Sequence, residues 1–460
     1  MADLNEITCV LIIGLGRIGL PQALAFAHAG IKVYGYDQSS EATKLLKKGK
    51  TPFFEPSMDE YLKSAIGKNF FPYSSWEELK THLHEVDAII FTIGTGAPND
   101  QDVLNAKQLD FSGYFTILDK IFSDKAALTK RIYLIVRTTL PLGGTDKLKE
   151  YIESKYSLTE GKDFFLAFVP ERITEGVAIE ELKTVPKIIG VYSNAAFSGI
   201  SKLFQNAGSI IIRVKNPITA EFCKLTDNSF RSTMFSFANE IAMHASEFDI
   251  NVEEVIKTVN HHYERNHIPL PGFVSGYCLS KDPYIFELGF SKDHGKRHFQ
   301  SVWFQGRKTN DYLVEFVLNK VMDHLKDPEN SCVAILGLSF KENVDDFRLS
   351  HSVVLINKLI KRNVKHLKLY DPYLDQNKYT TLPDELSSYM IAKSDILDEK
   401  FLSDVDAIVI CDRHQALCDL NKFETLNTLL KYTRKPCFIF DGWNIWTEAA
   451  KIKHIEYESI

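Results

Sequence analysis

A glycine-rich segment near the N-terminus restricts the fold more than any other feature of the chain. The run Gly14-Leu15-Gly16-Arg17-Ile18-Gly19 follows a short apolar stretch, residues 8–14, and opens a segment with helical spacing of its apolar residues. Asp37 ends the next apolar stretch, eighteen residues after Gly19. A G-x-G-x-x-G turn between strand and helix, followed by an acidic residue at this distance, predicts a dinucleotide-binding βαβ unit.

Each glycine of this turn has its own task. Gly14 permits the tight turn, Gly16 lets the backbone approach a pyrophosphate, and Gly19 lets helix and strand pack closely. The pyrophosphate is expected at the helix N-terminus, where Arg17 and Ile18 also lie. Asp37 is expected to accept hydrogen bonds from the adenosine ribose, and its charge would repel a 2′-phosphate. The pattern therefore favours NAD over NADP.

The rest of the chain predicts an α/β architecture with more than one domain. Apolar stretches alternate with helical segments up to about residue 215, which indicates a doubly wound parallel sheet. Residues 218–248 contain neither proline nor glycine and predict one long helix, an element that often carries a subunit interface. A second α/β unit begins near residue 331. We expect two Rossmann-like domains, residues 1–215 and 329–460, joined by a helical middle domain, residues 216–328.

Composition excludes several classes of function. A formal charge of −6 gives no electrostatic reason to expect nucleic acid or an anionic membrane as a partner. The seven cysteines form no C-x-x-C pair, which fits a reducing compartment and a cytoplasmic protein. No apolar run reaches the roughly 20 residues of a membrane helix. No cluster of histidines, cysteines and carboxylates has the spacing of a metal site.

Three further segments carry reactive or polar groups. Cys278 follows a loop with Gly272 and Gly276 and precedes Lys281-Asp282, which suggests an activated thiol, although a lone cysteine is more often a buried apolar residue. Lys224 and Asn228 stand four residues apart on the long predicted helix and share one face. Residues 169–176, VPERITEG, follow a predicted strand, so this loop is expected to face the cofactor cleft.

Six segments, taken together and in order, resemble the UDP-glucose/GDP-mannose dehydrogenase family. They are GLGRIGLP, RTTLPLGG, PERITEG, KLTDN followed by ANE, SGYCLSKDP, and GLSFKENVDDFRLSHS. The resemblance covers essentially the whole chain. It implies two Rossmann-like domains, a homodimer formed through the long helix, and oxidation of a nucleotide-sugar alcohol with two NAD.

The resemblance also implies roles for individual residues. Cys278 would hold the substrate as a thiohemiacetal and then a thioester, and Lys224 and Asn228 would stabilise the oxyanion at C6. A water held by Asp282 and Thr139 would enter as nucleophile, and Glu171 would assist the proton transfers. The cofactor site would include Gly14, Gly16, Arg17, Ile18, Gly19, Asp37, Thr139 and Glu175. The UDP-sugar would contact Glu171, Arg172, Lys224, Asn228, Arg265, Gly276, Lys341 and Arg348.

Two positions bear on the substrate and on activity. Arg172 after Pro170-Glu171 resembles members acting on UDP-N-acetylhexosamines, so we expect UDP-N-acetylmannosamine or UDP-N-acetylglucosamine, with UDP-glucose as the alternative. Phe273 and Ser275 stand where the family usually has glycine. If either residue needed a positive φ, strain of about 1–3 kcal/mol would follow. A catalytically silent NAD- or nucleotide-sugar-binding relative is therefore a further alternative.

A two-electron dehydrogenase of a hydroxy acid is the other enzyme that the first domain alone would allow. It would leave Cys278 and the whole C-terminal α/β unit unexplained. By family analogy, the expected uronate product would serve polysaccharide synthesis.

Overall fold

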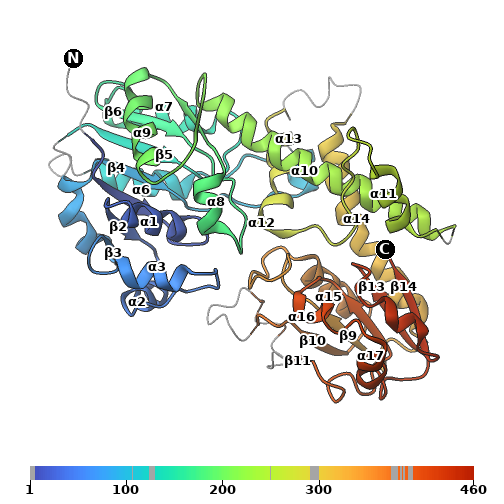
Figure 1. Ribbon diagram of the computed structural model, residues 1–460. Helices are drawn as coiled ribbons and strands as arrows, with labels where there is room; N and C mark the ends of the chain where they lie inside the picture. Colours follow the sequence, from blue (N-terminus) through green and yellow to red (C-terminus); the bar gives the residue numbers. More distant parts are fainter. Residues whose placement is uncertain are drawn as a thin grey trace. The chain divides into compact units, whose positions relative to one another are not determined.

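The computed structural model describes residues 6–105, 107–123, 130–248, 250–290, 300–374 and 397–460, with a few positions between 382 and 391. The chain divides into two compact units (Figure 1). The first comprises residues 1–227 and 288–292, and the second comprises residues 228–287 and 293–460.

The first unit is built on an eight-stranded sheet with helices on both faces. Its strand order is β3-β2-β1-β4-β5-β6-β7-β8, so the order reverses between β1 and β4. The strands are β1 (Cys9–Ile13), β2 (Lys32–Tyr36), β3 (Phe70–Tyr73), β4 (Ala88–Phe91), β5 (Ile132–Val136), β6 (Phe164–Phe168), β7 (Lys187–Val191) and β8 (Ile211–Val214). The helical segments are α1 (Gly19–His28), α2 (Ser40–Lys47), α3 (Met58–Ala65), α4 (Trp76–Leu79), η1 (Lys80–Glu85), α5 (Asp100–Leu104), α6 (Ser112–Phe122), α7 (Gly144–Tyr156), α8 (Ala178–Thr184) and α9 (Asn194–Asn206).

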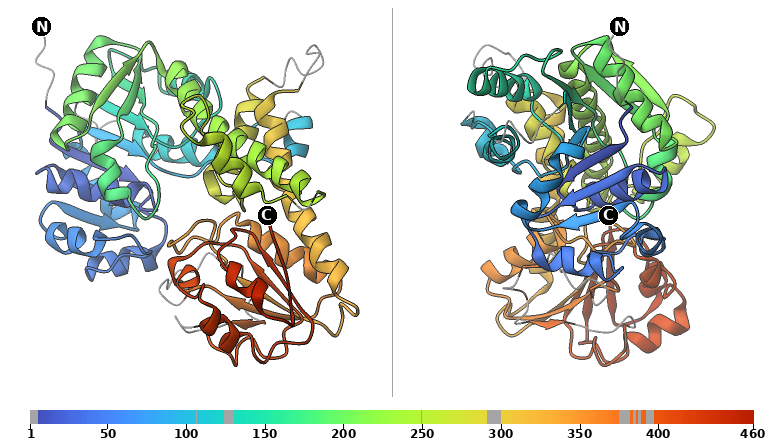
Figure 2. Two further views of the ribbon diagram at one scale, coloured as in Figure 1. Left: turned by 45° about the vertical axis from the view of Figure 1, so that its right-hand side comes forward. Right: turned by 90° about the vertical axis from the view of Figure 1, so that its left-hand side faces the viewer.

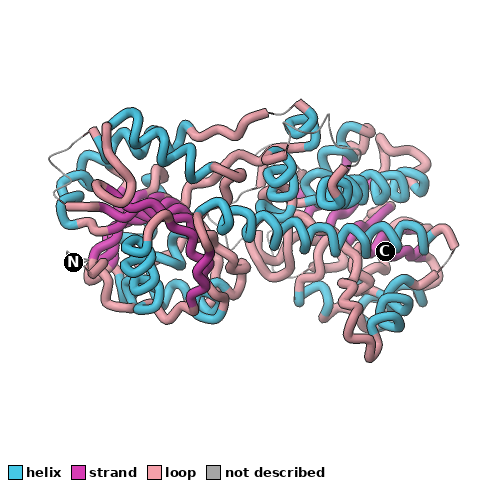
Figure 3. The backbone as a smooth tube through the Cα atoms, turned by 90° about the horizontal axis from the view of Figure 1, so that it is seen from above, coloured by secondary structure: helices cyan, strands magenta, loops and turns pink. Residues whose placement is uncertain are grey.

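Strand β1 shows why this sheet must be covered on both sides. All five of its residues are buried, and alternate side chains enter different cores. Val10 and Ile12 pack in the core that includes α1, α3 and α9, whereas Leu11 and Ile13 pack in the core that includes α6 and α7. A continuous apolar run is what a strand buried on both faces requires. The flanking helices can be followed in Figure 3.

One strand pair departs from the parallel arrangement that we expected. β7 pairs with β6 in antiparallel fashion, while the other pairs of this sheet are parallel. Antiparallel neighbours need no crossover to the other end of the sheet. The connection through α8 therefore joins the carboxyl end of β6 to the start of β7 at the same edge of the sheet. The residue pattern of β7 does not indicate this antiparallel direction.

The second unit contains a six-stranded parallel sheet of order β11-β10-β9-β12-β13-β14. Its strands are β9 (Cys332–Leu336), β10 (His366–Tyr370), β11 (Met390–Ile391), β12 (Ala407–Ile410), β13 (Cys437–Asp441) and β14 (Ile455–Ser459). Its helical segments are α11 (Val252–Asn260), α12 (Gly276–Leu279), α13 (Asp282–Leu288), α14 (Val302–His324), α15 (His351–Lys361), α16 (Gln415–Cys418), α17 (Phe423–Leu429) and η4 (Thr447–Lys451). Apolar residues of α14 and α15 pack in one core with those of β9, β10, β12 and β13. Figure 2 shows this sheet from two further sides.

Helix α10 (Pro217–Ser246) is the long element that the sequence predicts. Its 30 residues extend for roughly 45 Å without a break. It begins in the first unit and continues into the second. The predicted fold class, two Rossmann-like sheets with a helical middle region, is confirmed.

The second sheet repeats the local design of the first at its first turn. Gly337 has φ +86° directly after β9, as Gly14 has φ +95° after β1. The Leu338 N–H donates to Asp371 at the end of β10, just as the Leu15 N–H donates to Asp37 beyond β2, both at 2.8 Å. Among the described residues, no helix is long and apolar enough to cross a membrane.

Candidate functional site

The glycine turn after β1 has the shape of a pyrophosphate cradle. At Gly19 a Cβ atom would lie 1.8 Å from the carbonyl oxygen of Gly14, so the turn itself excludes a side chain there. At Gly16 a Cβ would meet nothing within 4 Å, so packing within the protein does not require glycine. A glycine beside open space is what a closely approaching ligand requires, and the residues present therefore fit a dinucleotide.

Asp37 is fixed by the backbone at the carboxyl end of β2. Its Oδ2 accepts from the Leu15 N–H and its Oδ1 from the Ser39 N–H, each at 2.8 Å. An ionised carboxylate can accept about four hydrogen bonds, so capacity remains for two ribose hydroxyls. The aspartate is thus held in one orientation beside the glycine turn.

The loop after β6 is anchored to the same edge of the first sheet. The Arg17 guanidinium lies 3.2 Å from the Glu175 carboxylate and over the Phe53 ring. The buried Glu55 carboxylate accepts from the Gly176 N–H at 2.9 Å. Ile18 is the N-cap residue of α1. The structure therefore brings Arg17, Ile18 and Glu175 to the start of α1, where the sequence places the cofactor.

Glu171 occupies a buried ionic cluster that the sequence does not reveal. Its carboxylate pairs with Arg137 and lies 3.3 Å from Lys187, and all three side chains are almost fully buried. Burial acts to raise the pKa of Glu171, but the Arg137 and Lys187 charges outweigh it, and the pKa is lowered. Glu171 is therefore held ionised. Thr139 is also buried, and its carbonyl accepts from the Thr95 hydroxyl at 3.1 Å.

Arg172 turns from the same loop toward α10. Its Nε donates to Asp227 Oδ2 at 3.1 Å, and 27% of its side chain stays exposed. Lys224 and Asn228 lie on either side of Asp227 in sequence and are only 6% and 3% exposed. Lysine and asparagine are seldom so buried unless they have polar partners. Lys224 and Asn228 are therefore buried polar residues on one face of α10.

Asp282 has two polar partners close in sequence or space to Cys278. It is fully buried and accepts from Asn228 Nδ2 and from Lys281 Nζ, each at 2.6 Å. Burial acts to lower the pKa of Lys281, but the charges of Asp282 and Cys278 outweigh it, and the pKa is raised. Lys281 is thus a buried ammonium next to the thiol. Lys281 is not among the site residues predicted from the sequence, and its burial beside Asp282 is what brings it to notice.

Cys278 differs from the other cysteines of the chain. Of the seven, Cys278 is the one that is exposed, and the other six are buried or half-buried. It lies in the single helical turn α12, three residues before Lys281. A cysteine kept at the surface beside a buried cation is in the setting of a reactive thiol rather than of an apolar core residue.

The two departures from the glycine-rich loop introduce no backbone strain. Neither Phe273 nor Ser275 has a positive φ, and the left-handed position of this loop belongs to Gly276, with φ +87°. A Cβ at Gly276 would lie 2.2 Å from the Phe340 ring, so glycine is required there twice over. Phe273 is buried in the core of the second sheet instead. The strain that would have accompanied a positive φ is absent.

The segment after β9 contains the cations expected to contact the nucleotide. Arg348 donates from Nε to both carboxylate oxygens of the buried Asp346, at 2.9 and 3.0 Å. Its guanidinium also lies over the Tyr277 ring, 5.1 Å from the centroid. Lys341 is half-buried in the same segment. The structure therefore places Arg348 beside the residue that precedes Cys278.

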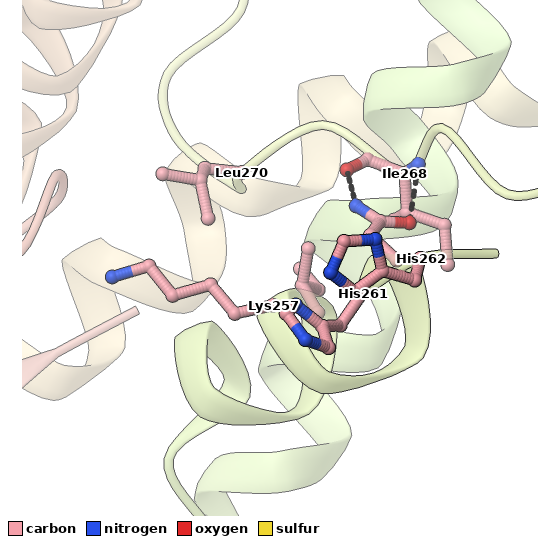
Figure 4. Close-up of a pocket in the computed structure, with 7 residues that line it drawn as sticks. Lys257, His261, His262, Ile268 and Leu270 are labelled. Carbon is pink, nitrogen blue, oxygen red and sulfur yellow. Dashed lines mark hydrogen bonds between the residues drawn. The ribbon is translucent and has the colours of Figure 1, made fainter. Parts of the chain in front are cut away.

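Arg265 lies in the loop that follows α11, with its guanidinium over the Tyr263 ring. A shallow hollow nearby is lined by Ile256, Lys257, Asn260, His261, His262, Ile268 and Leu270 (Figure 4). The Asn260 side chain ties this loop together by exchanging two hydrogen bonds with the backbone of Ile268.

Within the described part of the chain, no group of histidines, cysteines and carboxylates has a metal-binding arrangement.

Comparison with known proteins decides the family. Models of the UDP-glucose/GDP-mannose dehydrogenase family match the chain in three blocks: the NAD-binding domain at residues 8–208, the central domain at residues 218–312 and the UDP-binding domain at residues 334–448. The chain belongs to this family. It is therefore an NAD-dependent UDP-sugar dehydrogenase, an oxidoreductase acting on a CH–OH group, and the predicted cofactor is confirmed.

Several relatives of this dehydrogenase match it over nearly their whole length. A UDP-N-acetyl-D-mannosamine dehydrogenase from Pyrococcus horikoshii is 30% identical over 444 residues, which cover 95% of this chain and 96% of the relative. One from Campylobacter jejuni is 29% identical over 91% of this chain and 98% of its own. The solved structure of the UDP-D-ManNAc dehydrogenase from Pyrococcus horikoshii superposes with a TM-score of 0.79, covering 98% of this chain and 99% of that one. A UDP-glucose dehydrogenase structure from Pyrobaculum islandicum, 22% identical, covers 99% of this chain and 98% of its own with a TM-score of 0.80, and it shows the shared fold.

Proposed function

We propose that this dehydrogenase oxidises the C6 alcohol of UDP-N-acetylmannosamine or UDP-N-acetylglucosamine to the uronate in two steps, with Cys278 as covalent nucleophile. The observation that carries the proposal is the exposed Cys278 thiol beside a buried polar set, Lys281, Asp282 and Asn228. A thiol adduct retains the aldehyde that would otherwise escape between the two oxidations.

The choice of sugar rests on Arg172 and on the relatives. UDP-N-acetyl-D-mannosamine dehydrogenases match the chain at about 30% identity over nearly its full length. Arg172 is anchored through Nε by Asp227, so its remaining guanidinium N–H groups are oriented donors. The carbonyl oxygen of an acetamido group can accept hydrogen bonds from these N–H groups. A glucose hydroxyl is shorter and would place its acceptor oxygen at a different distance from them. We therefore favour an N-acetylhexosamine over glucose.

The proposed chemistry assigns the bonds as follows. NAD, held by the glycine turn and Asp37, would supply the hydride acceptor for each of the two oxidations. In the first oxidation C6 loses a hydride and its hydroxyl loses a proton, which gives the aldehyde. The Cys278 sulfur then bonds to the aldehyde carbon and the thiol proton goes to the aldehyde oxygen. The resulting thiohemiacetal becomes a thioester when C6 loses its second hydride and this hydroxyl loses its proton. Water held by Asp282 and Thr139 is proposed to attack the carbonyl carbon as the S–C bond breaks. One of its protons restores the Cys278 thiol, and the other is released with the carboxylate product.

Charge that develops on the C6 oxygen needs donors in a dry environment. Lys224 and Asn228 are both buried and are proposed to supply them. Asp282 orients the Asn228 amide by accepting one of its N–H groups at 2.6 Å. One such hydrogen-bond donor lowers the free energy of the transition state by on the order of 3 kcal/mol. Glu171, held ionised by Arg137 and Lys187, is proposed to accept protons only transiently, because its pKa is lowered.

The test is NADH absorbance with purified protein, NAD and a panel of UDP-N-acetylmannosamine, UDP-N-acetylglucosamine, UDP-glucose and GDP-mannose. We expect two NADH per sugar, with kcat/KM for an N-acetylhexosamine about 100-fold above that for UDP-glucose, since a site built for a polar group discriminates strongly. A preference of similar size for UDP-glucose would overturn the choice of sugar. NAD binding without NADH formation from any sugar would indicate a catalytically silent protein. The ordinary φ values of Phe273 and Ser275 give no reason to expect that outcome.

We also propose that the enzyme is a homodimer formed along α10. Three phenylalanines of this helix, Phe222, Phe230 and Phe237, are 45%, 62% and 51% exposed. Their spacings of eight and seven residues place them on one helix face. An apolar stripe left at the surface by the chain's own packing is typical of a subunit interface. A second copy of the same helix would cover it.

Replacing Phe230 by glutamate is expected to convert the dimer into monomers at micromolar concentration, because the interface would bury two charges near its centre. Light scattering after gel filtration measures the mass. Phe423→Glu is the matched control, since Phe423 is also an exposed aromatic residue, at 38%, but lies on α17 outside the stripe. Unchanged dimer mass for Phe230→Glu, or monomers in wild-type protein, would contradict the assignment.

A further inference from the structure

The turn that contains Cys278 is stabilised by contacts with other parts of the chain rather than by hydrogen bonds within the turn. This cysteine turn, residues 272–279, contains only one short helical segment, α12 (Gly276–Leu279). A single helical turn is not stable alone, because nucleation fixes several residues for one hydrogen bond. The N–H groups at the start of such a turn and the carbonyl groups at its end have no partners within the helix, and the carbonyls of the loop before it also need donors. The position of the thiol therefore depends on whatever contacts these ends.

Arg307 of α14 contacts both ends of the cysteine turn. Its Nη1 donates to the carbonyl of Val274 at 3.2 Å and to that of Leu279 at 3.4 Å, on either side of Cys278. The side chain is fully buried. Its Nε and Nη2 donate to Asp311 Oδ1 at 3.1 and 2.7 Å, which orients the guanidinium plane. A planar fork of fixed donors is suited to fastening two carbonyls at once.

His351, the first residue of α15, provides a second attachment from the UDP-binding domain. Its backbone N–H donates to the Ser275 hydroxyl at 3.1 Å, and its ring packs edge-on against Phe273. Its Nε2 lies 3.1 Å from Arg307 Nη2. A guanidinium can only donate, so Nε2 must be the acceptor and the His351 ring must be neutral. Arg307 and His351 are thus joined to each other as well as to the turn.

The two residues at which the loop departs from the family pattern both take part in these contacts. Phe273 packs against the His351 ring, and Ser275 accepts from the His351 backbone. Gly276 adds a bond from its N–H to the Leu349 carbonyl at 3.2 Å. Phe273, Ser275 and Gly276 therefore each fasten the loop to the second sheet or its helices.

We propose that Arg307 and His351 are positioning residues that fix the Cys278 sulfur for attack on the substrate carbonyl. The inference rests on the proposed role of Cys278 as the nucleophile. Displacement of a reacting group by about 1 Å can cost on the order of 100-fold in rate without loss of binding. Loss of either residue should therefore slow the chemistry far more than it weakens the complex with the UDP-sugar.

The test compares Arg307→Met with Lys308→Met, which removes an exposed cation from the neighbouring position of the same helix. For Arg307→Met we expect kcat to fall about 100-fold with KM for the UDP-sugar within about threefold of wild type. Free guanidinium at millimolar concentration should restore part of this kcat, and equal sodium chloride should not. His351→Gln keeps a side-chain acceptor and should be affected less than His351→Leu. Unchanged kcat in Arg307→Met, or a folded variant that guanidinium does not rescue, overturns the inference.

Amide hydrogen exchange tests the same idea without turnover. Peptides covering residues 273–282 should exchange faster in Arg307→Met than in wild type or Lys308→Met, while peptides from β9 and β12 stay unchanged. Equal exchange in the cysteine turn would overturn the inference, and a rise throughout the unit would show a general loss of fold and also count against it. If wild-type protein forms no NADH, the proposed function fails, and the exchange result still decides whether Arg307 fixes the turn.

Discussion

Replacement of Cys278 by alanine is expected to end uronate formation while NAD and the UDP-sugar still bind. Cys278 is exposed and lies in a one-turn helix, so its replacement by the smaller alanine removes no core packing. Without the sulfur, the aldehyde has no covalent anchor and the second oxidation loses its substrate. The rate of acid formation should fall by at least about 10⁴-fold, as expected for removal of a covalent nucleophile. Mass spectrometry of the product and NADH counting measure the loss.

The matched control is Cys418→Ala, which removes a half-buried thiol elsewhere in the second unit. Its kcat should stay within about twofold of wild type, in keeping with small effects at sites outside the machinery. For Cys278→Ala, at most one NADH per sugar is expected, with any aldehyde recoverable by a trapping reagent. Two NADH per sugar at more than a tenth of the wild-type rate would show that the thiol does not retain the intermediate.

Local sequence signals predicted much of the fold. The predicted alternation of apolar stretches and helical segments corresponds to the first sheet and its helices, and the second α/β unit begins with β9 at Cys332, close to the predicted residue 331. The long helix was predicted from the absence of proline and glycine and is α10. The antiparallel direction of β7 was not predicted, since direction depends on how the connection runs in space.

In the candidate site too, local features could be predicted from the sequence and long-range contacts could not. Gly14, Gly19 and Asp37 could be read from the sequence because their partners lie within one βαβ unit. The contacts of Glu171 with Arg137 and of Arg307 with Val274 join residues more than thirty positions apart, and no local pattern records such pairs. Long-range partners of this kind are fixed only when the elements pack.

For the loop before Cys278, the sequence indicated possible backbone strain but could not show whether the strain is present. Phe273 and Ser275 would be strained if they had kept the backbone conformation of a glycine-rich loop. Their φ values are ordinary, and Phe273 enters the core of the second sheet. The cost of replacing a glycine in this loop depends on the backbone path, and the sequence alone does not give that path.

Replacement of Asp282 by alanine is expected to destabilise the second unit as well as to abolish activity. Lys281 is 2% exposed and Asn228 is 3% exposed, and each donates to Asp282. Without the carboxylate, a buried ammonium has no counterion, which costs about 3–5 kcal/mol. Urea unfolding followed by far-UV circular dichroism measures the change. Asp282→Asn retains an acceptor but no charge and should lie between alanine and wild type.

A double replacement separates the two roles of this carboxylate. Lys281→Met with Asp282→Leu removes both buried charges and refills their space with apolar atoms, which is often neutral for stability. The double variant should therefore recover most of the stability that Asp282→Ala loses, a coupling that a double-mutant cycle would measure. It should recover none of the activity, because nothing then orients the Asn228 amide or holds a water for thioester hydrolysis. Recovery of uronate formation together with stability would show that Asp282 serves only to neutralise Lys281.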